Sequence, residues 1–179
     1  MSLTAEKIVK QALFYDGVTE DPKGSNNVIF NTDYYGRPVF GAAYAWCVVF
    51  VWDMFRITKG SELFYDGKKV SNTMIVENWG KKAGLIVPKE QAVRGDLVLF
   101  DFNHNGQSDH IGFALGSPAD GKIQTIEGNT DDQVGIRSRN MTDVCAVIRP
   151  KYDKPENHCD PNTCPIINYM KGLCSNVEH

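Results

Sequence analysis

The segment Tyr44-Ala-Trp-Cys-Val-Val-Phe-Val-Trp-Asp-Met-Phe55 is an almost unbroken apolar run. Ten of the eleven residues from 45 to 55 are apolar, which fits either a helix buried on nearly every side or a strand inside a core. The length favours the helix, because strands usually have about 5–6 residues. Gly41 and Gly60 are suitable boundaries, so the run predicts a buried helix of about three or four turns.

Cys47 falls in the first turn of this predicted helix. Unpaired backbone N–H groups and the positive end of the helix dipole stabilise negative charge there, which suits a nucleophilic thiolate. A buried cysteine can equally serve as a small hydrophobic side chain. The segment alone leaves both roles open, and a partner elsewhere in the chain is needed to decide between them.

The composition indicates one globular domain with a substantial core. The chain has 179 residues, of which 42% are hydrophobic and 23% charged, and its formal net charge is −3. No basic block suggests nucleic-acid binding, and no apolar run reaches the ~18–20 residues that would predict membrane insertion. The first residues lack the basic start and apolar middle of a signal peptide, so we expect synthesis in the cytoplasm.

The order of patterns predicts helices first and strands afterwards. Helical spacing is found in residues 4–14, 28–35 and 72–83, in addition to the cysteine helix. Short apolar runs bounded by Gly, Asn, Asp and Pro predict strands at residues 97–100, 111–115, 123–126 and 144–148. We therefore expect an α+β domain whose N-terminal helices pack on a mostly antiparallel sheet.

The end of the chain has a different composition. Residues 151–179 are rich in Pro, Asn, Asp and Cys, and we interpret them as a tail or the start of a linker after a domain of residues 1–150. The spacing of Cys159, Cys164 and Cys174 fits no common zinc finger, so a disulfide or free thiols are favoured over a zinc site.

A partner for Cys47 is offered by the predicted strands. His110 opens a buried strand, which can hold an imidazole rigidly, whereas the other three histidines lie in a turn or in the tail. Glu127 and Asn129 end a neighbouring strand two residues apart, so they face the same side if it stays extended. Either could orient an imidazole, although Glu127 could also be a solvated carboxylate and His110 a hydrogen-bonded strand-end histidine.

Four phrases occur in an order that resembles the CHAP family of cysteine, histidine-dependent amidohydrolases and peptidases. They are residues 44–52 around the cysteine, 94–100 (Arg-Gly-Asp-Leu-Val-Leu-Phe), 109–112 (Asp-His-Ile-Gly) and 125–129 (Thr-Ile-Glu-Gly-Asn). Residues 17–26 look like the loop that precedes the nucleophile in many phage-lysin members. The resemblance covers roughly residues 4–150 and implies a papain-like cysteine hydrolase fold.

The resemblance also implies roles for individual residues. Cys47 matches the nucleophile, His110 the base, Glu127 the orienting residue and Asn129 an additional polar member of the site. Close to the nucleophile, Tyr44 is a candidate second oxyanion donor, with aromatic packing as its alternative.

Trp46 is a candidate substrate-binding residue that would line the cleft, and core packing is its alternative.

We expect no metal or other cofactor, with calcium as the alternative to test. Some relatives bind calcium through closely spaced aspartates just before the nucleophile, but Asp33 is the only acid between Asp21 and Cys47. A different oxygen-rich run opens like an EF-hand loop but lacks its closing Glu, and Asn-Gly within it fits a hairpin turn. Its candidate calcium ligands are Asp101, Asn103, Asn105 and Asp109.

The resemblance implies a peptidoglycan hydrolase, either an N-acetylmuramoyl-L-alanine amidase or an endopeptidase. We expect a phage or prophage enzyme for host lysis that acts at the bacterial cell wall after release. One alternative is a CHAP-like amidase that acts on a soluble small amide. The other is a non-catalytic cell-wall-binding module in which Cys47 only fills the core.

Overall fold

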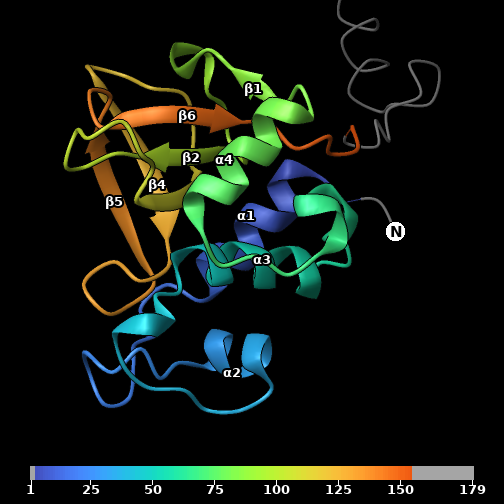
Figure 1. Cartoon of the computed structure of the whole chain (residues 1–179). Helices are drawn as coiled ribbons and strands as arrows, with labels where there is room; N and C mark the ends of the chain where they lie inside the picture. The colour runs from blue at the N-terminus through green and yellow to red at the C-terminus, as the bar shows by residue number, and fades with distance from the viewer. Residues whose placement is uncertain (1–2, 155–179) are drawn as a thin grey trace, which may run out of the picture.

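The apolar segment forms helix α3 (Cys47–Ile57), and Cys47 is its first residue. The structure is a computed structural model that describes residues 3–154 (Figure 1). Every residue of α3 from 47 to 55 is buried, because the helix lies between helix α2 (Ile29–Tyr35) and the sheet. The predicted helix and the place of Cys47 in its first turn are confirmed.

The other predicted helices are also present. They are α1 (Ala5–Phe14), α2 and α4 (Thr73–Lys82). Thr4 caps α1 by accepting the Lys7 N–H, and Asn72 caps α4 by accepting the Ile75 N–H. These side chains satisfy backbone donors that have no partner within the first turn of a helix.

The sheet within residues 3–154 has six strands, and all of its pairs are antiparallel. The strands are β1 (Ile86–Val87), β2 (Leu97–Phe100), β3 (His110–Ala114), β4 (Lys122–Glu127), β5 (Gly135–Asn140) and β6 (Val144–Ile148). Their order across the sheet is β1-β6-β2-β3-β4-β5. The expected α+β class and antiparallel pairing are confirmed, whereas β1 and β5 were not predicted.

Aromatic packing joins α3 to the centre of the sheet. The Phe113 ring on β3 lies 6.4 Å from the Phe50 ring and 6.0 Å from the Phe55 ring, measured between centroids. All three side chains are fully buried. This contact fixes the start of α3 relative to β3, and it therefore fixes Cys47 relative to the first residue of that strand.

Packing continues beyond the predicted domain boundary at residue 150. The Tyr152 ring stacks on Phe55 at 6.1 Å, and its hydroxyl donates to the Gly95 carbonyl at 2.9 Å. Asp153 accepts the Leu3 N–H at 2.8 Å. The folded unit thus includes at least residues 151–153, while the tail cysteines lie outside the described residues.

Within residues 3–154, every helix is too short or too polar to cross a membrane.

Candidate active site

The structure brings together three side chains that are distant in the sequence. Cys47 begins α3, His110 begins β3 and Glu127 ends β4. His110 Nε2 lies 2.9 Å from Glu127 Oε2, and the Cys47 side chain lies close enough to the imidazole to raise its pKa. Since Nε2 faces Glu127, the other ring nitrogen, Nδ1, is the one available to the thiol.

The register of the sheet explains how Glu127 reaches His110. Phe113 pairs with Ile126, so the next position places Gly112 beside Glu127, and His110 lies two residues further along the same face of β3. A Cβ atom on Gly112 would lie only 2.6 Å from Glu127 Cγ. The missing side chain at Gly112 leaves the space through which Glu127 crosses to the imidazole.

All three side chains are largely removed from water. Cys47 and His110 are each 8% exposed, and Glu127 is fully buried. Burial by itself lowers the pKa of His110, but its interactions with Cys47 and with the Glu127 carboxylate outweigh burial and raise that pKa from 6.5 to about 9. The imidazole is therefore a stable imidazolium at neutral pH.

The acid is held ionised by the same contacts. Burial alone raises the pKa of Glu127, but hydrogen bonds from His110, Arg139 and Thr125 and the charge of His110 lower it to about 2. The pair is thus a buried carboxylate beside an imidazolium. It can store a proton at Nδ1 and deliver it to a leaving group.

Arg139 is a site residue that the sequence did not reveal. Its guanidinium forms two hydrogen bonds to Glu127, from Nη2 to Oε2 at 2.6 Å and from Nε to Oε1 at 3.0 Å. Thr125 Oγ1 donates to Oε1 at 2.5 Å as well. Arg139 lies on β5, a strand that was missed because its sequence is mostly polar. The alternating arginines at 137 and 139 were the available signal.

Phe102 forms a wall beside the imidazole. Its ring centroid lies 5.7 Å from that of His110, and the Arg139 guanidinium lies 4.8 Å from the same ring. The Phe102 side chain is 39% exposed. It covers the His110–Glu127 pair on one side while it keeps an apolar surface open to a substrate.

Asn129 does not continue β4 in the extended conformation on which its alignment with Glu127 depends. Strand β4 ends at Glu127, and Asn129 has a left-handed φ of 55°. The prediction that Glu127 and Asn129 face the same side required an extended strand through both residues. Because the backbone turns at Asn129, this requirement is not met. The Asn129 amide instead donates to Asn26 Oδ1 at 3.4 Å, which connects it to the loop before α2.

Trp46 does not line a cleft. Its side chain is fully buried, stacks on Phe30 at 5.5 Å and donates its indole N–H to Glu20 Oε1 at 2.7 Å. The expectation of a substrate-binding surface at this residue is not met, because the ring has no exposed face to offer.

Tyr44 is half-buried in a short 3₁₀ helix (Ala42–Tyr44) that ends three residues before the cysteine. Its ring packs edge-on against Tyr35 at 5.1 Å. It stays a candidate oxyanion donor.

The oxygen-rich loop between β2 and β3 uses its carboxylates internally. Asp101 accepts the backbone N–H groups of Asn105 at 3.1 Å and Gly106 at 2.8 Å, and Asp109 accepts the Asn103 amide at 3.2 Å. Residues 3–154 contain no group of three or more His, Cys, Asp or Glu side chains placed to hold a metal ion. The loop connects an antiparallel pair, but it is longer than the two-residue turn expected at Asn105.

The calcium site of some relatives also lacks its ligands in this chain. Asp33, the one acid between Asp21 and Cys47, forms an ion pair with Arg56. Its carboxylate is therefore already neutralised by a cation and does not fit a calcium ligand.

The comparisons with known proteins agree with this geometry. Residues 39–129, just over half of the chain, match the family model of the CHAP domain. The matched range contains Cys47, His110 and Glu127, whereas Arg139 lies beyond it. A search of curated proteins finds no match. The chain belongs to the CHAP domain family, whose papain-like fold suggests cysteine-dependent amidohydrolase activity.

Proposed function

We propose that this protein hydrolyses an amide bond of bacterial peptidoglycan by covalent catalysis at Cys47. The observation that carries the proposal is the grouping of Cys47 with His110, whose imidazole is hydrogen-bonded to the buried Glu127 and whose pKa is raised by both neighbours. A nucleophile, a base within hydrogen-bond reach and a group that orients the base are the parts that acyl transfer needs. Family membership supports peptidoglycan as the substrate.

In the first half of the reaction, Cys47 Sγ attacks the carbonyl carbon and a C–S bond forms. The tetrahedral intermediate collapses when the C–N bond breaks. His110 Nδ1 gives its proton to the departing nitrogen, so the amine leaves neutral and a thioester remains on Cys47. Glu127 holds the imidazolium in place during this transfer and stabilises its charge.

In the second half, the neutral His110 takes a proton from water. The resulting hydroxide attacks the thioester carbonyl, the C–S bond breaks and the acid product leaves. The thiolate and the imidazolium are then restored. The complete cycle returns the pair to its starting protonation, so no further proton donor is required.

The oxyanion of the tetrahedral intermediate lies beside the start of α3. The Cys47 N–H is in the first turn of this 11-residue helix, where backbone N–H groups have no helical acceptor. It supplies one hydrogen bond to the oxyanion, and Tyr44 is our candidate for the second. Removal of one such donor typically costs about 10²–10³ in kcat.

We further propose that the enzyme serves host lysis by a phage or prophage. It would be made in the cytoplasm and would act at the cell wall after release. The resemblance of residues 17–26 to the corresponding loop of phage lysins supports this role.

Purified cell walls test the function directly. Wild-type protein should release soluble fragments, and mass spectrometry of new amino termini and free muramic acid ends would identify the bond cut. Cys47→Ala should release none, while Cys145→Ala should behave as wild type. Cys145 is the other cysteine within residues 3–154, and partial desolvation and nearby carboxylates raise the pKa of its thiol to about 11, which disfavours a reactive thiolate.

Two outcomes would overturn the proposal. If walls from a broad panel of bacteria stay intact with wild-type protein while Cys47→Ala still binds them, the protein is a wall-binding module. If walls stay intact but soluble small amides are hydrolysed in a Cys47-dependent way, the substrate class is wrong and the cysteine mechanism stands.

A further inference from the structure

A second surface site lies beside the last turns of α4, outside the Cys47 site. It is a cavity of about 570 Å³ whose lining includes the rings of Tyr65 and Trp79 and the polar side chains of Asp66, Asn78 and Lys82. We call it the Trp79 cavity. Its volume is in the range of small-molecule sites, which typically combine aromatic walls with a few polar groups.

Two polar side chains of this cavity have no partner among the described residues and can bind a ligand. Asn78 and Lys82 are four residues apart on α4, so they lie on the same face of the helix as neighbours. Both are exposed, and neither forms a hydrogen bond or ion pair within the part of the chain that the structure describes. They stand on either side of Trp79 along this face.

The aromatic wall is held in a fixed geometry. The rings of Tyr65 and Trp79 lie 6.3 Å apart at 72°, and Trp79 Nε1 donates to Asp66 Oδ1 at 3.1 Å. Tyr65 and Asp66 both have left-handed backbones, with φ values of 48° and 54°. Non-glycine residues adopt this conformation at an energetic cost, and such strain is concentrated at functional sites.

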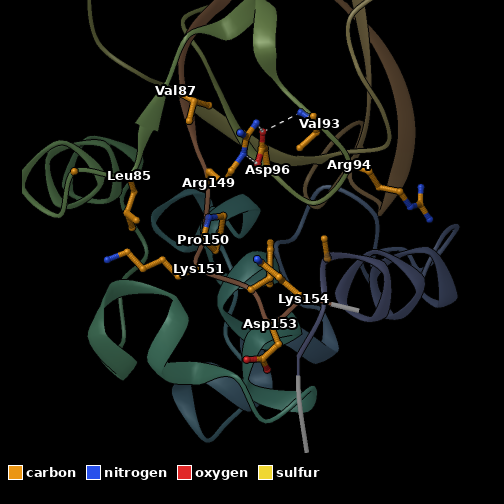
Figure 2. Close-up of a pocket in the computed structure, with 13 residues that line it drawn as sticks. Leu85, Val87, Val93, Arg94, Asp96, Arg149, Pro150, Lys151, Asp153 and Lys154 are labelled. Atoms are coloured by element: carbon orange, nitrogen blue, oxygen red, sulfur yellow. Dashed lines mark hydrogen bonds and ion pairs between the residues drawn. The ribbon is translucent and has the colours of Figure 1, made fainter. Parts of the chain in front are cut away.

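The Trp79 cavity continues into a longer furrow. A cavity of about 150 Å³ shares Asp66, Trp79 and Ala83 with it. The smaller cavity in turn shares Leu85 and Lys151 with a cavity of about 800 Å³. Figure 2 shows Leu85 and Lys151 on one side of that large cavity and Arg94 on the other. The three together form a track that suits a linear polymer better than a single small molecule.

We propose that the Trp79 cavity binds pyranose rings of a linear glycan, namely the glycan strand of peptidoglycan. The identity of the glycan rests on the proposed function. The apolar C–H faces of a pyranose pack on the Trp79 and Tyr65 rings, and its hydroxyl and acetamido groups hydrogen-bond to Asp66, Asn78 and Lys82. Aromatic rings with adjacent planar amide and carboxylate groups supply both kinds of contact.

The position of the cavity fits an accessory role. Thr73, at the start of α4, donates to the Ser108 carbonyl at 2.5 Å, two residues before His110. Trp79 lies six residues further along α4, or about 9 Å at 1.5 Å per residue. A peptide attached to the glycan extends about 3.3 Å per residue, so about three of its residues match this length of α4. The lining of the cavity includes none of the side chains of the Cys47 site, so we expect it to act on substrate binding and not on the chemical step.

Binding of β-1,4-linked N-acetylglucosamine hexamer to full-length Cys47→Ala protein tests this site. We expect saturable binding by calorimetry and a shift of the Trp79 indole N–H signal in NMR spectra. In the same background, Asn78→Ala and Trp79→Ala should each weaken binding, by roughly tenfold for the tryptophan. Phe14→Ala removes a ring that is 77% exposed on α1, outside the cavity, and should leave binding unchanged.

Trp79 also contacts Phe64, so Trp79→Ala could lower stability. Asn78→Ala and Lys82→Ala should leave stability unchanged, because neither side chain has a hydrogen-bond or ion-pair partner among residues 3–154. In the active enzyme, both should raise KM on intact walls and leave kcat on a short soluble peptide amide unchanged.

The proposal is overturned if the hexamer does not bind, or if binding persists unchanged in the Asn78, Trp79 and Lys82 variants. Failure here is distinct from failure of the proposed function. Walls cut by an enzyme that does not bind the hexamer would refute only the glycan site. Binding by a protein that cuts no walls would refute only the hydrolase.

Discussion

Glu127 is the residue on which the active site depends most. Its carboxylate is fully buried and accepts hydrogen bonds from three side chains, His110, Arg139 and Thr125. A buried carboxylate without such partners would become protonated, and it would then no longer stabilise an imidazolium. Glu127→Gln tests the effect of its charge, and Arg139→Gln tests the effect of the contacts that orient it.

Glu127→Gln should lower the upper pH limit of activity. Catalysis needs the His110 imidazolium as proton donor, and this form is present below its pKa of about 9 and lost above it. Without the carboxylate charge, that pKa falls, by about one unit or more. The basic limb of kcat/KM against pH on a soluble peptide amide should move to lower pH by this amount. An unchanged basic limb would show that Glu127 does not act on His110.

Arg139→Gln should lower kcat/KM by about tenfold or more, because Glu127 loses the two guanidinium hydrogen bonds that orient its carboxylate. Arg139→Lys restores the charge but not the two-point contact, so it should recover only part of the activity. Arg137→Gln is the matched control, since Arg137 binds Thr130 and Asp131 instead. Equal losses at 137 and 139 would mean that β5 is needed only for folding.

At the scale of elements, the site depends on how closely β3 and β4 approach. Gly112 provides this approach, since a Cβ atom there would meet Glu127 Cγ at 2.6 Å and the Ile126 carbonyl oxygen at 3.0 Å. The Ile126 carbonyl oxygen belongs to the backbone and cannot move away from such a Cβ atom as the end of a flexible side chain could. The same strand therefore both carries His110 and leaves room for the residue that orients it.

Gly112→Ala should cost about 1–3 kcal/mol of unfolding free energy and displace Glu127 from His110, with a loss of activity beyond the loss of folded protein. Gly116→Ala, just beyond β3, is the control. A Cβ atom at Gly116 meets nothing within 4 Å, so stability and activity should be kept. Urea denaturation and wall hydrolysis measured on the same samples would check both. Full activity in folded Gly112→Ala protein would contradict the account.

Several elements were predictable because their signals are local. The run of apolar residues specifies α3, and Thr4 and Asn72 mark the helix starts by the hydrogen bonds that they accept. Strand β5 was missed because its side chains are mostly polar, and so was Arg139. The course of the chain after Glu127 depends on a left-handed turn at Asn129, which the extended pattern of the preceding residues does not reveal.

On the scale of the whole molecule, Tyr152 and Asp153, which follow β6, pack on the folded unit. The Tyr152 ring stacks on Phe55 of α3, and its hydroxyl donates a hydrogen bond to the Gly95 carbonyl. Gly95 precedes β2, so this contact joins the end of the domain to the central strands and the helical layer. A boundary at residue 150 would remove it.

Tyr152→Ala should lower the free energy of unfolding by about 3–5 kcal/mol, as expected for loss of a large ring from a packed site. Tyr152→Phe should cost about 1 kcal/mol, because only the hydrogen bond to Gly95 is lost. Lys151→Ala, an exposed neighbour, should stay within about 0.5 kcal/mol of wild type. Urea denaturation measures all three, and a Tyr152→Ala protein as stable as wild type would place the domain end at residue 150.

The most direct test of the central claim is to trap the covalent intermediate. Wild-type protein is mixed with solubilised peptidoglycan fragments, quenched with acid during turnover, digested and mapped by mass spectrometry. The account predicts a thioester-linked fragment on the peptide that contains Cys47, none on the peptide that contains Cys145, and none in Cys47→Ala. An adduct on another residue, or turnover by Cys47→Ala, would contradict it.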